Sequence, residues 1–121
     1  MSALVLAGVG LLGGLGAVAR LLIDAAVSAR AARGFPSGTL AVNLTGAFLL
    51  GVLVGAAVSG DGLRLAATGL LGSFTTFSTW VLESHRAAED GRMRMGVANL
   101  AMSLALGLGM AWLGRLAGGA L

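Results

Sequence analysis

The charged residues of this chain divide it into long windows that contain no charge at all. These windows are residues 1–19, 34–60, 65–82 and 95–114. Each is close to the roughly 20 residues that a helix needs to cross the hydrocarbon core of a bilayer. We therefore expect an all-α membrane protein with both termini on one side, in which residues 1–121 form a single transmembrane domain. The expected spans cover about residues 3–27, 36–58, 63–84 and 93–116.

The composition excludes several classes of protein. Hydrophobic residues make up 57% of the sequence and charged residues 11%, which is too apolar for a soluble domain. The absence of cysteine excludes disulfides and thiolate metal sites, and a single histidine cannot form an imidazole cluster. The arginines lie between apolar blocks, so we expect no nucleic-acid partner. What remains is a channel, a transporter or a non-transporting assembly subunit.

The arginines are distributed unequally between the two ends of the predicted spans. Arg30, Arg33, Arg86, Arg92 and Arg94 flank the first and third connections, whereas Arg64 and Arg115 lie on the other side. Because arginine is enriched in cytoplasmic loops, we expect these two connections in the cytoplasm and both termini outside. We expect the second span to begin near Pro36, and residues 86–94 to form the third connection, with His85 in an exposed loop.

Small residues recur at helical spacing in three of the predicted spans. The pairs are Gly10 with Gly14 and Gly51 with Gly55, and the last span carries Gly107, Ala111, Gly114 and Gly118. Such stripes allow helix backbones to approach closely in lipid. They predict a compact and oligomeric bundle.

The third window contains a run rich in hydroxyl groups, where a spanning helix would ordinarily be rich in leucine. Residues 72–79 comprise one glycine, two serines, three threonines and two phenylalanines. The side chains either bond back to helix carbonyls and bend a continuous helix, or the helix unwinds at this point. Unwound carbonyls at this depth need a protein or ion partner, and the start of the next half-helix favours an anion. We expect a break near residues 72–76.

Polar residues in the second and fourth spans share one helical spacing. Asn43 follows Thr39 by one turn, and Ser103 follows Asn99 in the same way. These side chains either form hydrogen bonds between helices or line a path for an ion. The residues themselves leave both interpretations open.

Aromatic and charged residues near the run also allow two interpretations. Phe77 and Trp80 either pack in the bundle or turn the positive edges of their rings toward an anion that has lost its water. Arg20 either extends to the interface with Asp24 as a local partner or attracts anions to a pore mouth. Glu83 lies at the end of the third span as an interfacial acid.

Three segments of the chain together resemble the Fluc (CrcB) family of bacterial fluoride channels. They are residues 13–20, 38–51 and 69–80, the last followed by Glu83. The resemblance implies an antiparallel, dual-topology dimer with two fluoride pores. It also implies a sodium ion at the dimer centre, held by the backbone carbonyls of Gly72 and Thr75.

The same resemblance assigns residues to the fluoride pathway. It implies that Phe77 lines the pore and that Asn43 faces fluoride. The polar track would consist of Ser78, Thr79 and Ser103, with Glu83 near one end and Arg20 near a vestibule. The chain departs from the family where Trp80 replaces a usual second phenylalanine and Ser73 a common glycine. The Trp80 indole adds an N–H donor, which also suits fluoride.

The sequence therefore predicts a fluoride-selective channel, and not an enzyme, that exports cytoplasmic fluoride passively across the bacterial inner membrane. Its partners would be fluoride, lipid and a second subunit, either a second copy or an oppositely oriented homologue. One alternative is a small multidrug exporter, which needs a membrane-embedded carboxylate. The acids here lie near span ends or in loops: Asp24, Asp61, Glu83, Glu89 and Asp90. The other alternative is an assembly subunit.

Overall fold

The computed structural model describes residues 1–31 and 34–121, and the described chain folds into helices. Three spans are continuous: α1 (Ala3–Arg30), α2 (Ser37–Gly55) and α6 (Met93–Gly119). The third span is assembled from α3 (Gly60–Leu63), the π-helical segment η1 (Arg64–Leu71), α4 (Gly72–Phe74) and α5 (Ser78–Glu89). Within the described residues, four spans are long and apolar enough to cross a bilayer, with mean hydropathies of 1.9, 1.8, 1.2 and 1.5. The prediction of a multi-pass membrane protein is confirmed.

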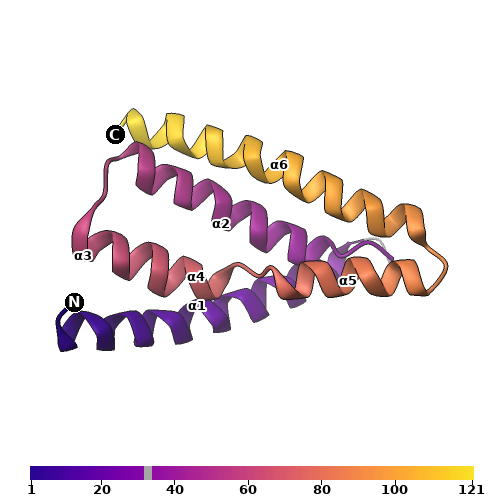
Figure 1. Cartoon of the computed structure of the whole chain (residues 1–121), viewed down its shortest axis with the longest axis horizontal. Coiled ribbons are helices and arrows are strands. Elements are labelled where there is room, and N and C mark those ends of the chain that lie inside the picture. Colours follow the sequence, from indigo (N-terminus) through magenta and orange to yellow (C-terminus); the bar gives the residue numbers. More distant parts are fainter. Residues whose placement is uncertain (32–33) are drawn as a thin grey trace.

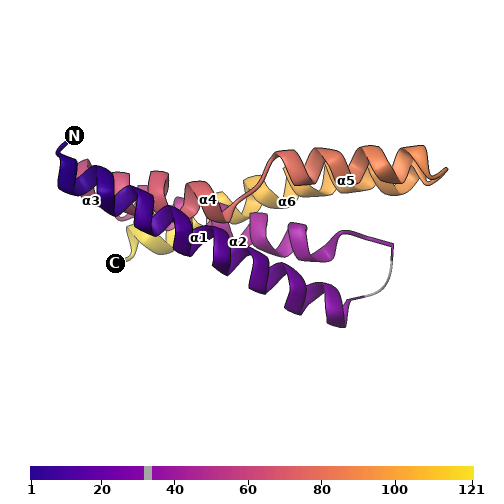
Figure 2. The same cartoon turned by 90° about the horizontal axis from the view of Figure 1, so that it is seen from below.

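The spans form a bundle with both chain ends at the same end of the molecule (Figure 1). α2 lies between the first half of the third span and α6, whereas α5 packs directly on α6 (Figure 1). α1 crosses the third span near α4 (Figure 1). Toward the other end, α1 and α2 separate from the α5–α6 hairpin (Figure 2). The connections α1–α2 and α5–α6 share this end, as expected for a chain of four spans; Arg33 lies outside the described residues.

α2 and α6 pack with their backbones in contact because glycines lie at the crossing. A Cβ added at Gly51 would overlap the carbonyl oxygen of Ala111, and one added at Gly114 would overlap that of Phe48. Two of the predicted stripes therefore form this interface. A Cβ added at Gly10, Gly14 or Gly107 would meet no atom of another described helix within 4 Å, so these positions leave room for another surface.

Two predicted helix ends at the connections are wrong. α5 continues to Glu89, so the connection to α6 is only residues 90–92. His85 therefore lies on an exposed helical face rather than in a loop, and Glu83 lies in the middle of α5 rather than at the end of the span. Ala87 and Ala88 are strong helix formers, and His85 Nε2 lies 2.9 Å from Glu89 Oε1, four residues on. α2 ends at Gly55 rather than at residue 58, because Ala57 adopts a left-handed φ of 58°.

The third span is broken, as predicted, but the break lies later in the run. Residues 72–74 stay helical, and residues 75–77 leave the helix, with Thr75 extended at φ −80° and ψ 158°. The interpretation as a continuous bent helix is wrong. α1 crosses at this point: a Cβ at Gly16 would overlap the Leu70 carbonyl oxygen and lie 3.2 Å from the Phe74 nitrogen.

Candidate functional site

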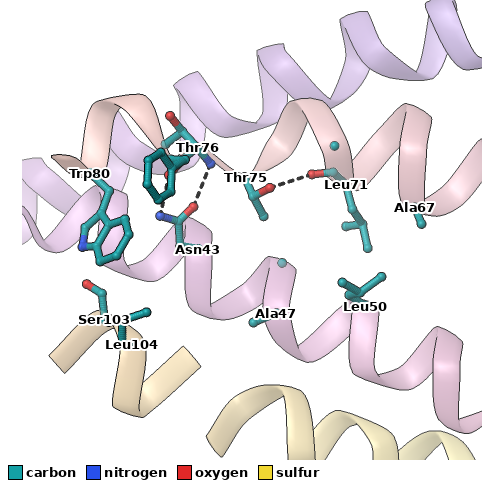
Figure 3. Close-up of a pocket in the computed structure, with 13 residues that line it drawn as sticks. Asn43, Ala47, Leu50, Ala67, Leu71, Thr75, Thr76, Trp80, Ser103 and Leu104 are labelled. Atoms are coloured by element: carbon teal, nitrogen blue, oxygen red, sulfur yellow. Dashed lines mark hydrogen bonds between the residues drawn. The ribbon is translucent and has the colours of Figure 1, made fainter. Parts of the chain in front are cut away.

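Asn43, in the middle of α2, supplies the hydrogen bonds that the break removes. Its Nδ2 donates to the carbonyl oxygen of Thr76 at 2.8 Å, and the Thr76 N–H donates to its Oδ1, also at 2.8 Å (Figure 3). The side-chain amide thus pairs with both polar groups of one residue, as a neighbouring peptide unit would. Backbone N–H and C=O groups without a partner are costly within a membrane span, so these two hydrogen bonds from Asn43 stabilise the non-helical conformation of the break. Its interpretation as a hydrogen-bonding residue between helices is confirmed.

The break also takes two donors away from carbonyls in the run. In a continuous α-helix, the N–H of Thr76 would bond the Gly72 carbonyl and that of Thr79 the Thr75 carbonyl. Instead, the Thr76 N–H donates to Asn43 and the Thr79 N–H donates to Thr76 Oγ1 at 3.2 Å. The carbonyls of Gly72 and Thr75 are thereby released from their helical donors.

A cavity of about 360 Å³ lies beside the break. The predicted site residues that line it are Asn43, Gly72, Thr75, Phe77, Trp80 and Ser103, from α2, the broken span and α6. Apolar side chains such as Leu50 and Leu104 form the rest of the wall (Figure 3). Residues 60 positions apart in sequence thus surround one space that is mostly apolar and carries a few polar groups.

Phe77 and Trp80 form an edge-to-face aromatic pair at the wall of this cavity. Their ring centroids lie 5.3 Å apart at an interplanar angle of 74°. Phe77 is 72% exposed, whereas Trp80 is half-buried. The Trp80 Nε1–H donates to the backbone carbonyl of Asn99 at 3.2 Å. The donor that the indole adds is therefore used inside the protein.

Asn99 and Ser103 do not share one environment. Asn99 is only 1% exposed, and its Nδ2 donates to Ser84 Oγ at 2.8 Å, so its amide connects α6 to α5. Ser103 lines the cavity, and its hydroxyl donates to Asn99 Oδ1 at 3.4 Å. For Asn99, the interpretation as a hydrogen-bonding residue between helices is confirmed.

Glu83 has a partner that the sequence analysis did not identify. The hydroxyl of Thr39, which is 3% exposed, donates to a carboxylate oxygen of Glu83. Glu83 also lines a second cavity of about 370 Å³, together with Arg86 and Arg92, at the end where the α1–α2 and α5–α6 connections lie. The spacing of Thr39 and Asn43 was the only available signal, because it places both side chains on one face of α2.

The remaining predicted residues lie outside the first cavity. Ser78 and Thr79 are the first residues of α5, Ser78 exposed and Thr79 half-buried. Arg20 does not pair with Asp24, whose Oδ1 instead accepts from Ser28 Oγ at 3.2 Å. Within the described residues, the Nε of Arg20 is buried without a hydrogen-bond partner. The interpretation of Asp24 as the local partner of Arg20 is therefore wrong.

Comparisons with known proteins agree on one family. The family model described as "CrcB-like protein, Camphor Resistance (CrcB)" matches residues 7–115. The chain is 53% identical over 108 residues to "Fluoride-specific ion channel FluC 2" of Mycobacterium tuberculosis, covering 89% of this chain and 86% of that protein. It is 46% identical over 112 residues to "Fluoride-specific ion channel FluC 1" of Symbiobacterium thermophilum, covering 88% and 90%. The corresponding protein of Geobacter sulfurreducens is 46% identical over 110 residues, covering 87% and 89%.

Proposed function

Because the chain belongs to the CrcB family, we propose that it is a fluoride-selective ion channel through which cytoplasmic fluoride leaves passively down its electrochemical gradient. The observation that carries the proposal is the break in the third span, where Asn43 forms hydrogen bonds to Thr76. Phe77, Trp80 and Ser103 line one cavity beside this break. Its relatives are ion channels by name, and the function needs no enzymatic step.

The chemistry of the cavity suits a small anion that has lost its hydration shell. A side-chain amide carries two N–H donors, and Thr76 uses one of those of Asn43, which leaves the second for an ion. Phe77 and Trp80 add positive ring edges. Ser78 and Thr79 stand at the N-terminal end of α5, where the helix dipole favours negative charge. Selectivity would come from fixed donors replacing water.

Two residues at the ends of this track complete the proposed pathway. Glu83, held by Thr39, would lie where the track opens into the second cavity. Arg20 would supply positive charge near a vestibule, because a guanidinium is always protonated. Its Nε is buried and has no hydrogen-bond partner within the described residues. A permanent cation at a pore mouth raises the local concentration of anions.

The proposed sodium site uses the carbonyls of Gly72 and Thr75. Both have lost their helical donors to Asn43 and Thr76, so they are available as ligands. Unwound backbone carbonyls in broken spans are suitable oxygen ligands for sodium. Two carbonyls from one chain leave the ion under-coordinated, which supports a site shared with a second subunit. The sodium would hold the break in a fixed conformation.

The proposed assembly is an antiparallel dimer with two pores in the bacterial inner membrane. Gly10, Gly14 and Gly107 leave room for another helix on the outer face of the monomer. Two inverted copies of one chain satisfy this arrangement, although the bias of the arginines toward one end also fits a pair of oppositely oriented homologues. We favour the homodimer.

Ion flux from proteoliposomes tests the function. The purified chain should release fluoride rapidly from loaded vesicles and release chloride negligibly. Equal fluoride and chloride release would remove the selectivity, and the absence of both would favour the assembly subunit. Proton-coupled uptake of a cationic drug would favour the exporter, although the Glu83 carboxylate is engaged with the Thr39 hydroxyl.

Labelling of the termini tests the topology. The chain has no cysteine, so one cysteine placed at either terminus gives a clean signal. In whole cells, an impermeant reagent should label a fraction of each single-cysteine protein, because a dual-topology chain inserts both ways. Labelling of all molecules or of none would require an oppositely oriented homologue as the partner.

A further inference from the structure

Trp80 differs from the other aromatic residue of the cavity because it carries a hydrogen-bond donor. The Phe77 ring is 72% exposed and has no polar group, whereas the Trp80 ring is half-buried and its Nε1–H reaches the Asn99 carbonyl at 3.2 Å. A carbonyl oxygen has two lone pairs, so the Asn99 carbonyl accepts the indole while it also serves the helix. The bond therefore joins α5 to α6 without opening either helix.

Further hydrogen bonds surround this contact. The Trp80 carbonyl accepts from Ser84 Oγ at 2.9 Å and from Asn99 Nδ2 at 3.5 Å. Asn99 Nδ2 also donates to Ser84 Oγ at 2.8 Å, and both side chains are almost fully buried, at 1% and 5% exposure. Trp80, Ser84 and Asn99 thus form one cluster, which we call the α5–α6 node. Buried polar networks with satisfied partners are rigid.

The backbones beneath the node are also in close contact. A Cβ at Gly96 would lie 2.6 Å from the Ser84 carbonyl oxygen, so α5 and α6 approach as closely as glycine permits. Asn99 extends the node to the cavity, because its Oδ1 accepts from Ser103, which lines the same wall as Trp80. One buried amide is therefore connected to two cavity-lining residues.

We infer that Trp80 acts in fluoride permeation as a positioning residue. Its indole N–H is bonded to the Asn99 carbonyl, and the α5–α6 node fixes the ring in an orientation that sets the shape of the cavity. Because this N–H already donates to the Asn99 carbonyl, it is not offered to the anion. This inference rests on the proposed channel function, but the state of the indole N–H can be tested without any flux.

The first experiment follows the indole ¹⁵N–¹H resonances of the full-length protein in detergent micelles. Trp112, which is 55% exposed on α6, is the internal reference, and a Trp112→Phe variant assigns the two signals. The Trp80 indole proton should exchange with D₂O more slowly than that of Trp112 and should not move during a sodium fluoride titration, with sodium chloride as the control. A saturable, fluoride-specific shift of the Trp80 proton would overturn the inference, as would exchange as fast as that of Trp112.

The second experiment measures single-channel fluoride current from Trp80→Phe in planar bilayers. Phenylalanine keeps an aromatic ring edge and removes the hydrogen bond together with the pyrrole part of the indole. An average hydrogen bond between membrane helices changes the ratio of the two conformations that it separates about threefold. We expect the unit conductance to fall by about two- to fivefold, with Trp112→Phe unchanged. Loss of a donor to an ion is larger, at least about tenfold.

The outcomes separate the roles of the indole. A fall of about tenfold or more would identify the N–H as a direct fluoride donor and overturn the inference. An unchanged unit conductance with fewer active channels would mean that the node affects only folding, which also overturns it. If the wild-type protein carries no fluoride current, the proposed function fails, whereas the exchange measurement still decides whether the indole is bonded to Asn99.

Discussion

Replacing Asn43 by leucine tests whether the break depends on one side chain. Leucine has the same side-chain branching as asparagine, without its polar groups, and a higher helix propensity. It removes both 2.8 Å bonds to Thr76 and leaves the Thr76 N–H and carbonyl without their partner. The break itself prevents these two groups from bonding within a helix.

The expected loss of stability follows from these two groups. A buried backbone donor or acceptor left without a partner costs roughly 1–3 kcal/mol, so the pair costs about 2–6 kcal/mol. The higher helix propensity of leucine offsets about 0.5 kcal/mol of this loss. The net loss in the free energy of unfolding is therefore about 1.5–5.5 kcal/mol, a large fraction of the roughly 5–15 kcal/mol typical of folded proteins.

The assay is unfolding by sodium dodecyl sulfate in mixed micelles, followed by far-ultraviolet circular dichroism. Thr45→Val is the matched control, because the Thr45 hydroxyl donates only to Ala41, a carbonyl of its own helix, at 2.7 Å. We expect that variant to stay within about 0.5 kcal/mol of the wild type. The reasoning is refuted if Asn43→Leu unfolds at the wild-type midpoint while fluoride flux persists, since another group would then satisfy Thr76.

Three further outcomes are expected from the packing, the acid partner and the break. Gly114→Ala should lower the free energy of unfolding by roughly 1–3 kcal/mol, since its Cβ would overlap a carbonyl of α2. Gly62→Ala is the control: its Cβ would make an ordinary contact with Val58 at 3.6 Å, so it should be neutral in the same titration. Thr39→Val should lower the free energy of unfolding by roughly 1.5–3 kcal/mol, because the Glu83 carboxylate loses its hydrogen-bond donor. Thr39→Ser keeps the hydroxyl and should unfold at the wild-type midpoint. Equal losses in both variants would mean that the hydroxyl is irrelevant. Replacing sodium by N-methylglucamine should lower the melting temperature of the wild type and of Thr75→Val alike. The reason is that the proposed ligand is a backbone carbonyl, while the Thr75 hydroxyl bonds the Leu71 carbonyl at 3.0 Å. A Thr75→Val protein whose melting temperature does not respond to sodium would assign the ligand to the side chain.

The sequence alone determined the four spans and the existence of the break, because both depend on local composition. Long windows without charge predict helices in a bilayer wherever they occur. Glycine and hydroxyl side chains weaken a helix through their own backbone, and this effect needs no distant partner. The end of α5 was predicted wrongly, since charged residues near Glu89 resembled a loop while Ala87 and Ala88 continued the helix.

Only the tertiary structure decided what each polar residue does. Asn43 bonds a residue 33 positions away, Thr39 one 44 positions away, and Trp80 one 19 positions away. In a bilayer, a polar group must find its partner within the protein, and which partner it finds depends on how the helices cross. The crossing of α2 and α6 on glycine, and of α1 beneath the break, brings these residues together. Trp80 shows the consequence. Its residue type predicted an N–H donor for an anion, but the position of α6 places the Asn99 carbonyl where it accepts that N–H.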